Sequence, residues 1–103
     1  MAFEHTKNRY ASFGVATSIP HEIIDTFWEI LDNYLIEVFP LNNTLTFYLL
    51  NKNNRLAIQY FDSHHDISIV FDYDFPSDDF LPTTVNIIDE AGVETIILPY
   101  EYN

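Results

Sequence analysis

The chain has no cysteine, only two glycines, and four basic residues in total. Without cysteine, disulfide bonds and cysteine-based zinc sites are excluded. Two isolated glycines leave no glycine-rich loop of the kind that cradles phosphate groups. No apolar run reaches the ~18 residues of a membrane span, and the N-terminus lacks the apolar stretch of a signal peptide. We therefore expect a cytoplasmic protein.

The scarcity of lysine and arginine restricts the kinds of partner. Sixteen acidic residues against four basic ones give a formal net charge of −12 at pH 7. No base follows Arg55, whereas seven aspartates and three glutamates do, so that part of the chain carries a formal −10. Binding to nucleic acid or to an anionic membrane requires cations, and both are disfavoured. The imbalance favours a protein partner with a basic surface.

The residues that are present predict a single folded domain, residues 1–103. Hydrophobic residues make up 48% of the chain and aromatic residues 17%, which is enough for a core. Apolar residues recur at helical spacing between Ser18 and Leu35 and predict one long amphipathic helix. Phe27 and Trp28 are its expected core residues. Before this helix, alternation from Arg9 to Val15 predicts a strand, with Gly14 at a bulge or at a close approach of another backbone.

Five more strands are predicted after the helix, separated by short turns rich in asparagine and aspartate and by one loop with two prolines. They cover residues 45–50, 56–61, 67–73, 84–89 and 93–98. Short connections favour antiparallel pairing. The sequence therefore predicts an α+β fold, in which one long helix packs on a mostly antiparallel sheet of about five to six strands in the order β-α-β-β-β-β-β.

Two sets of acidic residues are candidates for partner binding. The polar face of the predicted helix is a stripe of carboxylates, Glu22, Asp25, Glu29 and Asp32. Neighbouring carboxylates on a helix repel, and a rigid array of anions resembles a nucleic-acid backbone. The second set is interleaved with aromatic residues, which stack on guanidinium groups while carboxylates pair with them: Asp62, Asp66, Asp72, Asp74, Asp78 and Asp79. In the alternative interpretation, both sets are solvated polar surface and the rings are core.

The segment Asp62-Ser-His64-His65-Asp66 could in principle hold a divalent metal. Adjacent histidines on a turn point apart, however, and the His-Glu-x-x-His spacing is absent. We therefore interpret it as a polar hairpin turn and expect no metal and no cofactor. No nucleophile motif or phosphate-binding loop is present, so we expect the protein not to be an enzyme.

The beginning of the chain resembles a known family. The resemblance lies in the segment from Arg9 to Val15, then in Ile19-Pro20, Phe27-Trp28 and Ile30-Leu31-Asp32. There the chain resembles the opening of short Firmicutes and phage proteins called domain-of-unknown-function family nine-sixty. The resemblance covers about the first third of the chain, and it implies a shared fold more than an activity. By type, the small, acidic, cysteine-free chain is also similar to anti-CRISPR proteins. The nucleases that those proteins block hold nucleic acid in a positively charged channel.

Three functional hypotheses follow. The first is an acidic inhibitor, an anti-CRISPR protein that blocks guide RNA or DNA binding by a Cas9-type nuclease. The second is a housekeeping or regulatory module that binds another protein or forms a homodimer. The third is a metal-dependent hydrolase that uses Asp62, His64, His65 and Asp66. The sequence favours the first and leaves the oligomeric state open.

Overall fold

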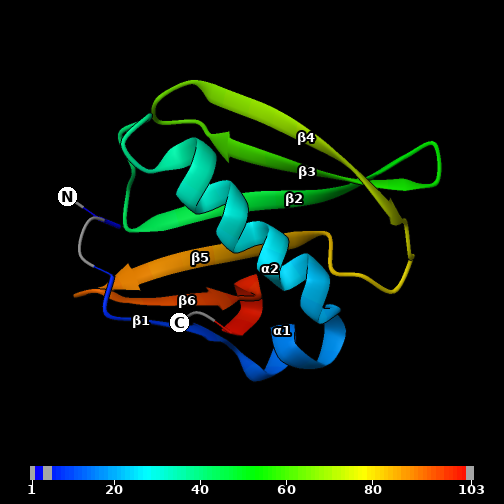
Figure 1. The fold of residues 1–103 in the computed structure, drawn as a ribbon, viewed down its shortest axis with the longest axis horizontal. Coiled ribbons are helices and arrows are strands. Elements are labelled where there is room, and N and C mark those ends of the chain that lie inside the picture. The colour runs from blue at the N-terminus through cyan, green and yellow to red at the C-terminus, as the bar shows by residue number, and fades with distance from the viewer. Residues whose placement is uncertain (1, 4–5, 102–103) are drawn as a thin grey trace.

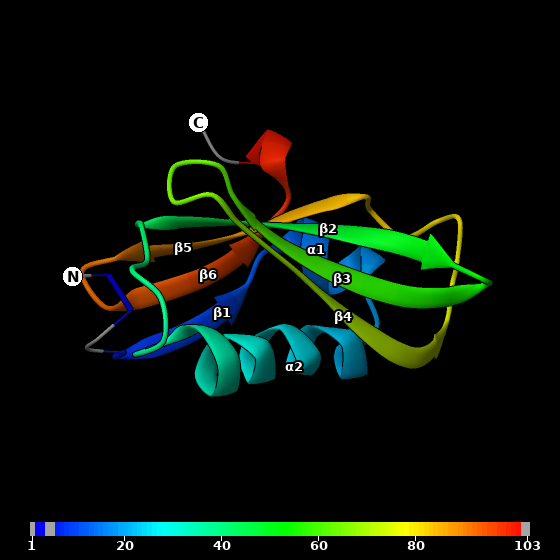
Figure 2. The same ribbon diagram turned by 90° about the horizontal axis from the view of Figure 1, so that it is seen from above.

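The computed structural model describes residues 2–3 and 6–101. Its centre is a twisted six-stranded sheet with the order β1-β6-β5-β2-β3-β4 (Figure 1). The longest helix crosses one face of this sheet, and the short C-terminal helix lies on the other (Figure 2). Along the chain the elements are β1 (Asn8–Ala11), α1 (Phe13–Ser18), α2 (His21–Ile30), the π-helical η1 (Leu31–Leu35), β2 (Thr44–Lys52), β3 (Arg55–Asp62), β4 (Ile67–Pro76), β5 (Thr84–Glu90), β6 (Val93–Ile97) and the 3-10 helix η2 (Pro99–Glu101).

The predicted fold class is wrong, because the molecule is mostly β. In the described part of the chain, α2 and η1 together form a helical segment of 15 residues, and α1 adds 6. The sheet is mixed: β1 runs parallel to β6, while the other neighbouring strands are antiparallel. Strands β1 and β6 are far apart in the sequence, so no pattern of neighbouring residues could predict that they pair.

The first predicted strand is too long at its C-terminal end. It ends at Ala11 because Ser12 caps α1, where its Oγ accepts the N–H of Val15 at 3.2 Å. Gly14 therefore lies in the first turn of a helix and not at a strand bulge. A second helix then begins at His21 and continues into the π-helical turn η1.

The core lies between the 15-residue helical segment and the sheet. Phe27 and Ile30 are fully buried, and the ring of Phe27 meets Phe47 of β2 edge-on, with centroids 5.4 Å apart. Trp28 is not a central core residue, contrary to expectation: it is partly buried at the β1 side, and the Arg9 guanidinium lies 4.9 Å from the centre of its ring.

Strands β2 and β3 form an antiparallel hairpin, which confirms the pairing expected from the short asparagine-rich turn between them. Asn53 and Asn54 form its two-residue turn with φ of 56° and 65°, a conformation that asparagine tolerates. Strand β4 extends to Pro76, three residues beyond the predicted end. Its inward-facing side chains are half-buried along its whole length, and we call this row the β4 stripe: Ile67, Ile69, Phe71, Tyr73 and Phe75.

Candidate functional site

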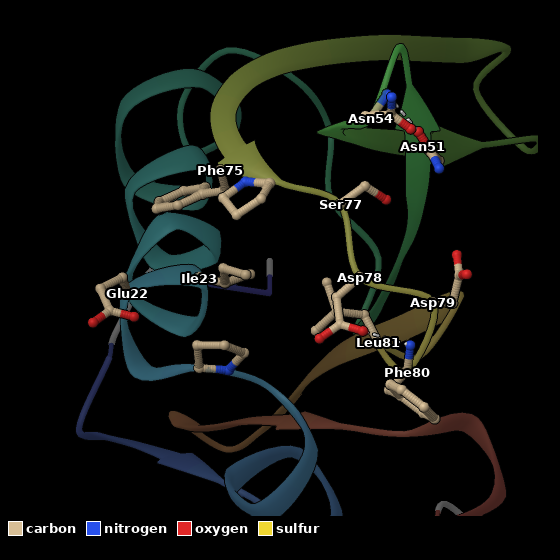
Figure 3. A pocket seen from close by; sticks show the side chains of 12 residues that line it. Glu22, Ile23, Asn51, Asn54, Phe75, Ser77, Asp78, Asp79, Phe80 and Leu81 are labelled. Atoms are coloured by element: carbon tan, nitrogen blue, oxygen red, sulfur yellow. Dashed lines mark hydrogen bonds between the residues drawn. The ribbon is translucent and has the colours of Figure 1, made fainter.

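A groove of about 710 Å³ lies between the start of α2, the β2–β3 hairpin and the loop that follows β4 (Figure 3). Helix α2 contributes Glu22 and Ile23 on one side, and the loop contributes Asp78 and Asp79 on the other. The groove thus joins segments that are distant in the sequence. Its full lining is Pro20, Glu22, Ile23, Asn51, Asn54, Phe75, Pro76, Ser77, Asp78, Asp79, Phe80 and Leu81.

The loop wall of the groove is fixed by hydrogen bonds. The N–H of Ser77 donates to the carbonyl of Asn54 at 3.0 Å, which ties the loop to the hairpin. The carboxylate of Asp78 accepts the N–H of Phe80 at 2.9 Å, and the Asp78 carbonyl accepts the N–H of Leu81 at 3.0 Å. Such turns orient the acidic side chains on a defined backbone.

The groove combines an apolar floor with an acidic rim. Ile23 is buried, and Phe75 and Leu81 are partly buried. Glu22 and Asp79 are exposed on the rim. None of the lining residues, all of which lie in the described part of the chain, is a lysine or an arginine. The groove therefore suits a ligand with cationic heads and apolar stems.

Beyond the groove, the helical segment packs beside β4. The ring of Tyr34 in η1 lies 5.1 Å from the ring of Phe71. Burial, followed by the nearby Tyr34 and Glu29, raises the pKa of Tyr73. The helical segment and β4 therefore run side by side in opposite directions, and the half-buried β4 stripe faces the helix.

The predicted helix stripe exists, but its charge is partly neutralised. Glu22, Asp25 and Glu29 are exposed. Asp32 forms a bidentate pair with Arg9, with N–O distances of 2.8 and 2.5 Å. His21 lies 3.4 Å from Asp25.

The acidic residues of β4 also face cations of the same chain. The ammonium of Lys52 lies 3.2 Å from the carboxylate of Asp72, and Arg55 lies 2.6 Å from the carboxylate of Asp74. All four side chains are mostly exposed, so each pair contributes at most ~1 kcal/mol to folding. The ten candidate acids therefore do not form one uninterrupted anionic array.

Asp62 does not suit partner binding, because it is 9% exposed and holds the β3–β4 turn. Its carboxylate accepts the N–H groups of His64 and His65 at 2.9 and 3.2 Å, and it lies 2.7 Å from Nδ1 of His65. Burial raises the pKa of Asp62, but these bonds outweigh it and the pKa is lowered overall. Asp66 closes the same turn with φ of 55°.

The hydrolase hypothesis requires a cluster of side chains that can hold a metal ion. Within residues 2–3 and 6–101, no group of three or more histidine, aspartate or glutamate side chains could hold a metal ion. The imidazoles of His64 and His65 meet edge to face, with centroids 4.9 Å apart, instead of pointing apart as expected. The turn is thus built around the bonds of Asp62.

Of the ten candidate residues, the groove gathers Glu22, Asp78 and Asp79. The sequence did not predict that Ile23 and Phe75 line one groove. Ile23 belongs to the predicted helix, and Phe75 is one of the aromatic residues interleaved with the second acidic set. The alternation of β4, which continues through Phe75, was the available signal that this residue shares a face with the strand before it.

Comparisons with known proteins confirm the resemblance to family nine-sixty and extend it from the first third of the chain to residues 8–101. Among solved structures, the chain is similar to a protein of unknown function from Enterococcus faecalis, with 35% identity, a TM-score of 0.91, and coverage of 94% of this chain and 92% of that chain. No curated protein matches the chain. None of the helices in the described part is long and apolar enough to cross a membrane. Residues 8–101 match the family described as "Staphylococcal protein of unknown function (DUF960)", and the chain belongs to this family.

Proposed function

We propose that the protein is a binding module that holds a basic segment of a partner protein in the groove. The supporting observation is that Glu22 of α2 and Asp78 and Asp79 of the loop surround an apolar floor. Lysine and arginine fit both parts, because their stems can cover Ile23 and Phe75 while their charged heads meet the carboxylates.

Binding is a better proposal than catalysis because the polar side chains that line the groove are carboxylates, asparagines and one serine. No histidine or lysine among these lining residues could activate a nucleophile. As part of the same proposal, we place the protein in the cytoplasm, where a chain without cysteine needs no oxidising environment.

A calorimetric titration with a peptide tests the proposal. The probe is acetyl-Lys-Val-Lys-Val-Lys-Val-Lys-amide, and its counterpart has glutamate in place of lysine. The groove variant carries Glu22→Gln, Asp78→Asn and Asp79→Asn, and asparagine can still accept the loop hydrogen bond at position 78. The matched control carries Asp25→Asn, Glu37→Gln and Glu90→Gln, which removes the same charge from exposed positions outside the groove.

We expect the lysine peptide to bind and the glutamate peptide not to bind. The groove variant should weaken the affinity by about tenfold or more, with little change in the control, and high salt should weaken binding to the wild type. Equal weakening in both variants would show that only net charge matters and would contradict a site in the groove.

A Cas9-type nuclease is one specific partner that this proposal allows. The net charge of −12 supports it, although the pairing of Asp32, Asp72 and Asp74 with cations reduces the resemblance to a nucleic-acid backbone. Titrating a panel of Cas9 proteins with and without guide RNA, at low and high salt, tests this case. An absence of binding to every member would end the anti-CRISPR hypothesis and leave the peptide experiment unaffected.

A further inference from the structure

Strand β4 is an edge of the sheet. It pairs with β3, and no other strand of the described residues lies on its outer side. Within the part of the chain that the structure describes, Figure 1 shows no helix or strand along this side. Exposed edges of this kind are templates for another extended chain, because their outward N–H and C=O groups lack a strand partner.

The hairpin geometry identifies which β4 groups point outward. A two-residue turn makes Lys52 and Arg55 a hydrogen-bonded pair, so alternate residues of β2 bond to β3 and the others to β5. The N–H of Leu49 indeed donates to the carbonyl of Thr83, just before β5, at 2.9 Å. By the same alternation, positions 58 and 60 of β3 bond to β4.

These two positions of β3 pair with Phe71 and Ile69, whose backbone groups therefore point into the sheet. Ser68, Val70 and Asp72 consequently direct their N–H and C=O groups outward. Their side chains are exposed on the face of the sheet away from α2. The middle of the edge thus offers regularly spaced donors and acceptors.

The half-exposed face of β4 that looks toward α2 can receive the side chains of an added strand. The β4 stripe is half-buried and could be covered further. Tyr34 and Glu29 of the helical segment lie beside the β4 stripe, and the groove with Glu22 lies at the Phe75 end of the stripe. An edge strand beside a helix is the arrangement in which a peptide adds to a sheet and places alternate side chains in a cleft.

We infer that an extended basic segment of a partner protein pairs with β4 as a seventh strand and ends in the groove. This inference rests on the proposed function and specifies how the segment is held. Backbone hydrogen bonds to Val70 and its neighbours hold the segment, and side chains facing α2 cover the β4 stripe. Lysine or arginine at these positions brings its charge to Glu29 and Glu22.

Charge argues for this occupant over a second copy of the chain. A second copy would bring a further net charge of −12 to the edge, and Lys52 and Arg55 offset only Asp72 and Asp74 there. A basic segment instead lowers the repulsion among the exposed carboxylates of α2, Glu22 and Glu29.

A proline substitution separates backbone pairing from attraction by charge. Val70→Pro removes the outward N–H at the centre of the edge, and edge strands tolerate proline at such positions. Val70→Ala is the matched control, because it shortens the side chain and keeps the N–H. The probes are the lysine–valine peptide and the same peptide N-methylated at every residue, which keeps its charge.

We expect Val70→Pro to weaken binding of the unmethylated peptide by about tenfold or more relative to Val70→Ala, and the methylated peptide to bind the wild type equally weakly. Circular dichroism verifies that the proline variant folds. If it does not fold, slower amide hydrogen exchange at Val70 and Asp72 of the wild type on peptide binding supports the inference, and unchanged exchange contradicts it.

Each contrary result has a separate meaning. Equal binding by both Val70 variants and both peptides would overturn strand addition, while a weakened groove variant would still support the proposed function. An absence of binding by any lysine peptide would overturn both. A concentration-dependent dimer of the wild type that Val70→Pro abolishes would assign the edge to a second copy and overturn the inference.

Discussion

The carboxylate of Glu101 accepts the backbone N–H of Gly14 at 3.0 Å and so joins the C-terminal helix η2 to the first turn of α1. The same carboxylate accepts the hydroxyl of Ser12 at 2.6 Å and the N–H of Leu98 at 2.9 Å. A negative group at this position satisfies N–H groups that a helix start leaves free. One side chain therefore connects segments from opposite ends of the chain.

Gly14→Ala should destabilise the protein, although alanine normally favours a helix over glycine. A Cβ at position 14 would lie 2.8 Å from Oε2 of Glu101, so the carboxylate must move and lose hydrogen bonds. We expect the free energy of unfolding in urea to fall by about 1–2 kcal/mol.

A Glu101→Ala background provides the control for this substitution. There the steric conflict is gone, and Gly14→Ala should raise the free energy of unfolding by ~0.5–1 kcal/mol. The same sign of effect in both backgrounds would contradict the contact.

Glu101 should also make stability depend on pH in the acid range. The hydrogen bond from Ser12, followed by that from the N–H of Leu98, lowers the pKa of Glu101, while burial opposes this shift. Its stabilising contribution is therefore complete above the pKa of about 4.3 of an unfolded glutamate and is lost as the pH falls through the lower pKa of the folded state. The melting temperature of the wild type should fall more steeply than that of Glu101→Gln over this range. Parallel curves for the two proteins would contradict a linked protonation.

Local patterns predicted the elements whose contacts are local. The Asn53-Asn54 turn and the alternation of β4 could be read from adjacent residues. The end of β1 was missed although the cap at Ser12 is local, because the residues around it also alternate as in a strand, and the bond from Gly14 to the distant Glu101 leaves no local pattern. Contacts between distant segments also decide two other features. These are the parallel pairing of β1 with β6 and the placement of Glu22 and Asp78 on opposite walls of one groove.

Removing the hydroxyl of Tyr60 should not destabilise the protein. Tyr60 is 1% exposed, and its hydroxyl makes no hydrogen bond of good geometry among the described residues, although the carboxylate of Asp62 lies near it. Tyr60→Phe should leave the free energy of unfolding unchanged or raise it by up to ~1 kcal/mol, because an unsatisfied buried group is removed. Tyr60→Ala should lower it by about 3–5 kcal/mol, since the ring packs 5.5 Å from Phe47.

The hydroxyl of Tyr60 should also make the free energy of unfolding depend on pH in the alkaline range. Burial, followed by the charge of Asp62, raises the pKa of Tyr60 to about 12. Between the ordinary tyrosine pKa of about 10 and this value, the unfolded state loses the proton more readily, so stability falls as the pH rises. Unfolding in urea across this range should show a smaller fall for Tyr60→Phe than for the wild type. Equal falls would contradict the raised pKa.

Arg9 should contribute to stability chiefly through the buried Glu94 and only weakly through Asp32. Glu94 is fully buried, and its carboxylate accepts the Nε–H of Arg9 at 2.8 Å and the hydroxyl of Thr6 at 2.7 Å. Arg9→Met would leave that buried charge without its cation and should lower the free energy of unfolding by about 3–5 kcal/mol. Asp32→Asn should cost less than about 1 kcal/mol, because the Asp32 side chain is 46% exposed.

A double variant separates the buried pair from general effects of losing Arg9. Adding Glu94→Met to Arg9→Met removes the unpaired carboxylate and should recover most of the lost stability. Urea unfolding followed by the fluorescence of Trp28, which lies against Arg9, measures all the variants on one probe. Equal costs for Arg9→Met and Asp32→Asn, or no recovery in the double variant, would show that the buried carboxylate does not depend on Arg9.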